Sequence, residues 1–89
     1  MKTHELKTWP GPFQAVLDGN KRAELRKDDR GFRVGDTLLL REYWPDGARP
    51  DITVRRALRC VVTHIVEGGK FGLDPEYVML SITDVELAP

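Results

Sequence analysis

The sequence predicts an α+β, mostly β fold, namely a small mixed β-barrel of about five strands with one short helix packed at its side. Three observations support this prediction. Short segments alternate between apolar and polar residues, as strands with one buried face do. Clusters of turn residues separate these segments, and one helical pattern lies near the amino terminus. Because 89 residues can bury one compact core, we expect residues 1–89 to form a single domain.

The amino-terminal part is expected to contain a short strand and the helix. The strand, Glu5–Trp9, ends at prolines, which fix φ and push the preceding residue toward extended geometry. Pro12 suits the first turn of a helix over Pro12–Asp18, since the N–H that proline lacks has no intrahelical partner there. Gly19 is typical of a helix end. The expected buried stripe of this helix consists of Phe13, Val16 and Leu17.

The rest of the chain is expected to form strands joined by turns and loops. The β-rich segments are Arg22–Lys27, Thr37–Trp44, Arg56–Val66 and about Tyr77–Thr83, the last of which could extend to Leu87. The expected turns and loops are Asp28–Gly31, Val34–Asp36, Pro45–Gly47 and Lys70–Glu76. On the first of these strands Glu24 and Arg26 share one face, and Leu25 lies on the other.

Charge is balanced over the whole chain and uneven along it. The chain has 14 basic and 14 acidic residues, and this zero net charge argues against binding of nucleic acid through bulk charge. Positions 21–33 nevertheless hold six basic and three acidic residues, and no basic residue follows position 70. We therefore expect one basic patch and one acidic end. The alternative is an ordinary solvated mixture of surface charges.

Several kinds of chemistry are disfavoured by what the sequence lacks. Cys60 is the single cysteine, which excludes an internal disulfide and a cysteine-based zinc site and agrees with a reducing cytoplasm. There is no Gly-rich phosphate loop, GxSxG or HExxH motif, so we expect no metal and no cofactor. The first nine residues lack an apolar signal region, and no segment is long enough to span a membrane. We expect a cytoplasmic protein with no membrane partner.

Two residues with reactive side chains lie in the longest β-rich segment. Cys60 is flanked by apolar residues, and we expect it to be inert core packing. His64 alternates with Cys60 and Val62, so we expect it to face the core as a satisfied histidine and not to act as a base or ligand.

The segment Gly19–Arg26 is the strongest candidate for a functional site. Lys21 lies just beyond the expected helix, and Glu24 and Arg26 share one face of the next strand. A lysine, a carboxylate and a guanidinium would thus converge beside the helix. In a partly dry groove, loss of solvation disfavours the charged lysine, whereas Glu24 favours it and can relay a proton. The alternative is an exposed strand face whose charges pair with one another.

A wider set of segments carries a family resemblance. These segments are His4–Pro10, Phe13, Asp18–Lys27, Asp29–Asp36, Gly68–Leu73 and Tyr77–Ile82. Their centre is the pattern G-x-K-x-x-E-x-R followed by V-G-D. The combination resembles the DUF3850 family, an ASCH-related branch of the PUA-like superfamily. The resemblance covers nearly the whole chain and leaves out the loop Pro45–Asp51.

The resemblance implies a small β-barrel whose helix closes one side, with a cleft lined by the G-x-K motif. Similar small bacterial ASCH proteins are amidohydrolases that cleave N4-acetylcytidine to cytidine and acetate without a metal. Their catalytic set is a lysine, a threonine three residues later and a glutamate in the later part of the chain. By this resemblance the lysine is Lys21, the threonine position holds Glu24, and the nearest candidate for the later glutamate is Glu67.

The first functional hypothesis is a metal-free amidohydrolase acting on N4-acylated cytidine or a related modified pyrimidine nucleoside. Lys21 would activate water, and Glu24 would orient Lys21 and pass a proton to the departing amine. Arg26, or a backbone amide near Gly19, would stabilise the developing oxyanion. The aromatic residues expected to stack on the pyrimidine are Trp9, Phe71 and Tyr77, with packing in the core or at the cleft rim as the alternative.

The second hypothesis is a non-catalytic RNA-binding module. Its expected phosphate contacts are Arg22, Arg26, Lys27, Arg30 and Arg33, and the same aromatic residues would stack on an unpaired base. A third is an accessory domain whose activity depends on neighbouring proteins. Monomer and weak dimer are both compatible with the sequence. A Lys21–Glu24 pair in a deep, base-sized pocket would favour catalysis, whereas a shallow basic groove would favour RNA.

Overall fold

The computed structural model describes residues 1–44 and 55–89. In chain order the elements are β1 (Thr3–Thr8), α1 (Pro10–Leu17), β2 (Ala23–Lys27), β3 (Thr37–Glu42), β4 (Ala57–Val66) and β5 (Tyr77–Ala88). The expected turn at Pro45–Gly47 and the loop to Asp51 lie outside the described residues. Within the described ranges, no helix is long and apolar enough to cross a membrane.

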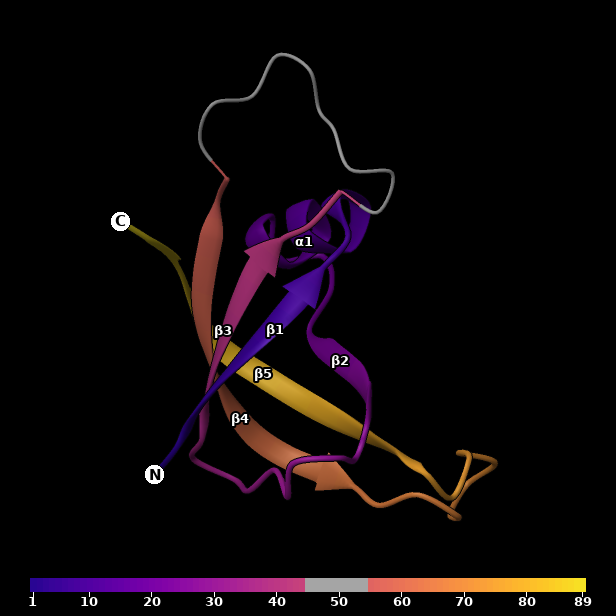
Figure 1. Ribbon diagram of the computed structural model, residues 1–89. Coiled ribbons are helices and arrows are strands. Elements are labelled where there is room, and N and C mark those ends of the chain that lie inside the picture. Colours follow the sequence, from indigo (N-terminus) through magenta and orange to yellow (C-terminus); the bar gives the residue numbers. More distant parts are fainter. Residues whose placement is uncertain (45–54) are drawn as a thin grey trace.

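The strands form one mixed sheet in the order β1-β3-β4-β5-β2 (Figure 1). β1 and β3 run parallel, and every other pair of neighbours is antiparallel. The sheet curls into a half-barrel, and α1 packs against β3 and β5 beyond the carboxyl ends of β1 and β3. The predicted fold class, mostly β with one short helix beside about five strands, is confirmed.

The core lies between the inner face of the curled sheet and α1. Alternate residues of β1 and β3 point inward, as the two-residue period of a strand requires. The fully buried apolar side chains include Phe13, Val16, Leu38, Leu40, Leu58, Val62 and Leu80. The stripe predicted for the helix is confirmed, with Phe13 and Val16 fully buried and Leu17 packed partly buried against the core.

The helix begins two residues earlier than predicted, at Pro10. Trp9 is extended, with φ −62° and ψ 154°, and its carbonyl accepts the Phe13 N–H at 2.9 Å. Pro10 and Pro12 therefore both lie in the first turn, where a missing N–H breaks no helical hydrogen bond. Gly19 ends the helix with φ +80°, a left-handed conformation that glycine adopts without strain.

The first and last strands are longer than predicted. β1 begins at Thr3 and not at Glu5, and β5 runs to Ala88, beyond both predicted ends. The pairing of β4 with β5 shifts by one residue between Val61–Thr83 and Arg59–Glu86. Asp84 lies inside this shift and has φ +55°. A bulge therefore lets β5 continue where its sequence pattern breaks.

His64 does not face the core, contrary to the prediction. It is exposed, and the register of β4 with β5 shifts between Val62 and His64. A bulge at this point reverses which residues face inward, so the alternation that placed His64 with Cys60 does not continue. Cys60 itself is fully buried, as predicted, and burial raises the pKa of its thiol to about 12.

The V-G-D turn before β3 is tied to β1 through a buried side-chain hydrogen bond. His4 Nε2 lies 2.7 Å from Asp36 Oδ2, and both side chains are almost completely buried. The backbone amides of Lys2 and Arg33 also donate to this carboxylate, at 3.2 and 3.0 Å. The hydrogen bond from His4, aided by these amides against the opposing effect of burial, lowers the pKa of Asp36 from 3.8 to about 2.

Candidate functional site

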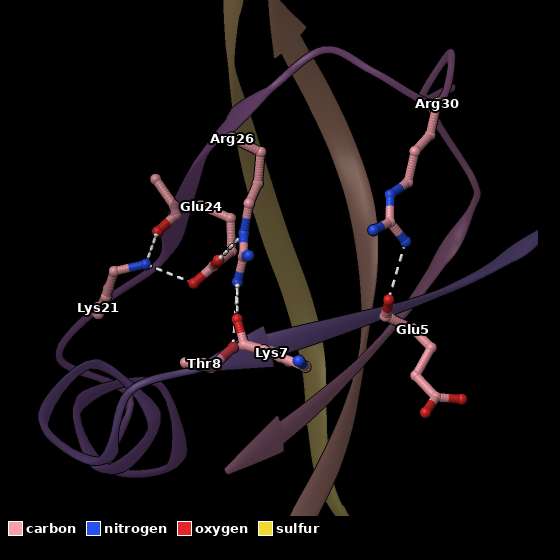
Figure 2. A network of polar contacts seen from close by, with 8 residues as sticks. Glu5, Lys7, Thr8, Lys21, Glu24, Arg26 and Arg30 are labelled. Atoms are coloured by element: carbon pink, nitrogen blue, oxygen red, sulfur yellow. Dashed lines mark hydrogen bonds and ion pairs between the residues drawn. The ribbon is translucent and has the colours of Figure 1, made fainter. Parts of the chain in front are cut away.

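The two edge strands of the half-barrel, β1 and β2, are connected by arginine side chains. They are not neighbours in the hydrogen-bonded order of the sheet. Arg26 Nη2 donates to the Lys7 carbonyl at 3.0 Å, and Arg30 Nη1 donates to the Glu5 carbonyl at 2.8 Å (Figure 2). Lys7 and Glu5 are two residues apart, so their carbonyls leave β1 on the same side. Guanidinium groups therefore cap the free edge of β1.

Glu24 is the central residue of this connection. Its side chain points inward from β2 and is only 4% exposed, although it carries a carboxylate. Glu24 Oε1 lies 2.5 Å from Lys21 Nζ, and Oε2 lies 3.0 Å from Arg26 Nε. One buried carboxylate thus binds two cations, an arrangement that offsets part of the desolvation cost of all three charges.

Lys21 reaches Glu24 because of the way in which α1 ends. The amide of Gly19 donates to the Val16 carbonyl, and the amides of Asn20 and Lys21 both donate to the Ala15 carbonyl. This turn directs the chain back toward β2, and Lys21 Nζ then also donates to the Ala23 carbonyl. The amides of Gly19, Asn20 and Lys21 are therefore already used in the helix end.

A pocket of about 290 Å³ opens beside this cluster, and we call it the Lys21 pocket. Its lining residues are Lys7, Thr8, Trp9, Pro12, Lys21, Glu24, Leu25 and Arg26. The volume lies at the lower end of the usual range for small-molecule sites, about 300–1,000 Å³. Trp9 is 60% exposed and gives the pocket a free aromatic face. The pocket thus combines a stacking surface with a buried carboxylate and three cationic side chains, those of Lys7, Lys21 and Arg26.

A second hollow, of about 610 Å³, follows the edge of β1, and we call it the β1-edge groove. It is lined by Glu5, Leu6, Lys7, Arg26, Arg30 and Arg41. Lys7 and Arg26 also line the Lys21 pocket, so the two hollows adjoin. Arg41 is ion-paired with the Glu5 carboxylate, and both side chains are more than half exposed.

The structure brings four of the predicted site residues to one pocket and leaves four others outside its lining. Trp9, Lys21, Glu24 and Arg26 line the Lys21 pocket. Glu67, Phe71, Tyr77 and Gly19 do not. Glu67 is exposed after β4 beside Lys70, and Phe71 is 94% exposed on the loop before β5. Tyr77 opens β5, opposite Lys27 of β2.

The residues predicted to contact phosphate are spread over the surface. Arg30 lies in the β1-edge groove, and Lys27 borders a smaller hollow beside it. Arg22 Nε donates to the Gly19 carbonyl at 3.1 Å. Arg33 contributes its backbone amide to Asp36, and its side chain is exposed. The structure therefore gathers only part of this set around one groove.

Two polar lining residues, Lys7 and Thr8, were not among the predicted site residues. The Thr8 side chain points inward and accepts a hydrogen bond from Arg26 Nη2 at 3.1 Å (Figure 2). Lys7 Nζ lies 4.9 Å from the centre of the Tyr43 ring. The inward position of Thr8 could have been read from the alternation of β1. Its position beside Arg26 depends on the curl of the sheet, which no local pattern shows.

The cluster can bind an anion or a polarised carbonyl. It holds the Lys21 amine 2.5 Å from the Glu24 carboxylate, beside the permanently charged guanidinium of Arg26. Among the described residues, no group of three His, Cys, Asp or Glu side chains is placed to hold a metal ion. Cys60 is fully buried in the core, which leaves it without access to a substrate.

Two comparisons place the chain among known proteins. The model of a family described as "Domain of unknown function (DUF3850)" matches residues 3–82. An "Uncharacterized 12.9 kDa protein in GpA 3'region" of Escherichia phage P2 is 52% identical over 42 residues. The matching segment is 47% of this chain and 38% of the phage protein, so the chain spans well under half of that relative. Every residue that lines the Lys21 pocket falls within the family match.

Proposed function

This chain belongs to the DUF3850 family, and we propose that it is an ASCH-type, PUA-like domain over residues 1–89 that hydrolyses N4-acylated cytidine or a related pyrimidine nucleoside without a metal. The observation that carries the proposal is the chain of contacts from Lys21 through buried Glu24 to Arg26 beside a nucleoside-sized pocket. A few convergent polar groups in a pocket are the usual features of a small-molecule site.

In the proposed mechanism Lys21 and Glu24 act as one proton-transfer unit. Lys21 in its neutral form removes a proton from the attacking water, and the Glu24 carboxylate orients the Lys21 nitrogen and relays the proton. The resulting hydroxide adds to the acyl carbonyl carbon. The tetrahedral intermediate collapses with cleavage of the C–N4 bond, and the proton returns from the pair to the departing N4 amine. The products are cytidine and the carboxylic acid, which releases its proton to solvent and leaves as the carboxylate.

Arg26 is the proposed oxyanion binder, and Trp9 the proposed stacking residue. The Arg26 guanidinium stays positively charged and is held by contacts to Glu24, Lys7 and Thr8, so it is preorganised for the charge that develops on the acyl oxygen. The free face of Trp9 suits a pyrimidine ring. The roles considered for Glu67, Phe71 and Tyr77 are not part of this proposal, since these residues do not line the pocket.

The test is incubation of the purified protein with N4-acetylcytidine, followed by chromatographic measurement of cytidine. The wild type and Lys70→Ala, which removes an exposed lysine outside the pocket, are expected to release cytidine, and Lys21→Ala is not. Lys21→Ala is expected to keep its unfolding free energy within about 1 kcal/mol of wild type. Activity should survive dialysis against a chelator. Turnover by Lys21→Ala would contradict the role given to Lys21.

A second candidate, a non-catalytic RNA-binding module, is favoured by one specific observation. Lys21 Nζ donates to two acceptors, the Ala23 carbonyl and the Glu24 carboxylate, which stabilises the ammonium as a fixed hydrogen-bond donor. A fixed donor beside an exposed tryptophan suits recognition of an unpaired base. Binding of single-stranded RNA without any turnover of N4-acetylcytidine would select this candidate.

A further inference from the structure

We propose that the β1-edge groove is a phosphate subsite, so that the ligand of the Lys21 pocket is a nucleotide and not a free nucleoside. This inference rests on the proposed function only in placing a pyrimidine in the Lys21 pocket. It applies equally to a mononucleotide and to a nucleotide within RNA, because both present the same phosphate oxygens.

The first argument is charge. The β1-edge groove is lined by Lys7, Arg26, Arg30 and Arg41 against the single carboxylate of Glu5. Adding Lys21 and Glu24 from the adjoining pocket, and Asp29, which pairs with Arg30 at 3.3 Å, gives five cations and three carboxylates, an excess of two on one face. The chain as a whole has a net charge of zero. The excess on this face therefore attracts an anion specifically to this side of the molecule.

The second argument is continuity. Lys7 and Arg26 line both hollows, so a ligand in the Lys21 pocket can extend into the β1-edge groove without leaving the protein surface. Lys7 and Glu5 are separated by two residues of strand, about 7 Å. This span suits the ribose that joins a base to its phosphate. The base would lie against Trp9, and the phosphate beside Arg41 and Arg30.

The third argument is preorganisation. Arg26 and Arg30 lie side by side across the gap between β2 and β1, each anchored on a carbonyl of β1 (Figure 2). Each guanidinium has further N–H donors besides those that it uses on β1, and these can bind phosphate oxygens. Because the protein fold already holds both groups, binding a phosphate costs little side-chain entropy.

Glu5 is the competitor that the phosphate must displace. Its carboxylate pairs with Arg41, and this pair is largely exposed. An exposed pair contributes little to stability, so the carboxylate can leave Arg41 at small cost. A phosphate carries more negative charge and more acceptor oxygens than a carboxylate. We therefore expect Arg41 to exchange partners when a nucleotide binds.

The experiment compares ligands that differ only in phosphate, by titration calorimetry at low salt. Cytidine 5'-monophosphate is expected to bind about tenfold more tightly than cytidine, since a charge-assisted contact is worth about one factor of ten. The preference should shrink as salt is raised. A 5'-phosphorylated cytidine trinucleotide separates the two sources of phosphate: tighter binding than the monophosphate assigns RNA, and equal binding assigns the mononucleotide.

Two variants with opposite expected signs test the assignment to this groove. Arg41→Gln removes a cation and is expected to weaken binding of the monophosphate about tenfold, with cytidine unchanged. Glu5→Gln removes the competing carboxylate and is expected to strengthen monophosphate binding about threefold. Lys70→Gln, which breaks a comparably exposed ion pair outside both hollows, is the matched control and should change neither affinity.

Failure of the phosphate subsite and failure of the proposed hydrolase would give different experimental results. Turnover of N4-acetylcytidine with equal affinity for cytidine and its monophosphate overturns the phosphate subsite and leaves the hydrolase intact. Preferential binding of the monophosphate without turnover overturns the hydrolase and supports the subsite. A preference that Arg41→Gln and Glu5→Gln leave unchanged also overturns the assignment to this groove.

Discussion

Glu24 and Asp36 are two buried carboxylates with different surroundings. Asp36 accepts hydrogen bonds from the His4 ring on β1, from the Lys2 amide just before β1 and from the Arg33 amide in the turn before β3. Glu24 instead holds the long side chains of Lys21 and Arg26, which are 33% and 23% exposed and line a pocket.

The difference shows why burial of a charge does not by itself mark a functional site. The donors to Asp36 are two backbone amides and a buried ring, and none of them can turn toward a ligand. The hydrogen bonds of Asp36 therefore serve only to stabilise the fold. The donors around Glu24 reach solvent and can meet a ligand. What separates the two carboxylates is whether their partners face a pocket.

The largest expected effect is on stability at Asp36. Asp36→Ala leaves the buried His4 ring and two backbone amides without their acceptor, and we expect the free energy of unfolding to fall by about 3 kcal/mol. Urea denaturation measures the change. Asp29→Ala, which removes an exposed carboxylate, is the control and should stay within about 0.5 kcal/mol. Equal effects of the two variants would contradict a structural role for Asp36.

The next effect is a loss of stability in acid. The pKa of Asp36 is about 2 in the folded protein and 3.8 as the ordinary value, so the folded state favours the ionised form. The ionised carboxylate therefore contributes about 2 kcal/mol to the free energy of unfolding. This contribution is fully present above pH 4 and is lost as the pH falls through about 2. Urea midpoints between pH 5 and pH 2 measure it, and Asp36→Asn should make the curve flatter. A wild-type curve as flat as that of the variant would contradict the prediction.

Replacement of Glu24 is expected to have the smallest effect on stability and a large effect on activity. Glu24→Gln keeps the shape of the side chain and removes its charge, so partly exposed Lys21 and Arg26 remain solvated, and we expect a loss of about 1 kcal/mol. Hydrolysis of N4-acetylcytidine should fall at least about a hundredfold, because the proton acceptor is lost. Glu86→Gln, on the exposed part of β5, is the control for both measurements. Full activity of Glu24→Gln would make Glu24 a structural residue like Asp36.

Much of the fold could be predicted because it depends on local patterns. The helical spacing of Phe13 and Val16 and the stop at Gly19 are properties of neighbouring residues, and each appears in the structure as expected. His64 was placed on the wrong face because bulges interrupt the pairing of β4 with β5. A bulge depends on the partner strand and leaves no clear mark on the bulged one.

The candidate site was predictable only where its residues are close in sequence. Lys21, Glu24 and Arg26 span six positions, and strand alternation was enough to group two of them. Thr8 and Lys7 join them through the closure of the half-barrel, between strands that are 15 residues or so apart in the chain and at opposite edges of the sheet. Separation along the chain does not indicate which residues of two edge strands come into contact.

The sequence by itself determined the class of fold, the helix with its end at Gly19, and the grouping of a lysine just before β2 with a carboxylate and a guanidinium on it, because local sterics and periodicity decide these. Only the tertiary structure decided that Glu24 is buried between two cations, that arginines cap the free edge of β1, and that the Lys21 pocket continues into a basic groove. These features arise where edges of a curled sheet approach each other, and the curl is a property of the whole sheet and not of any one strand.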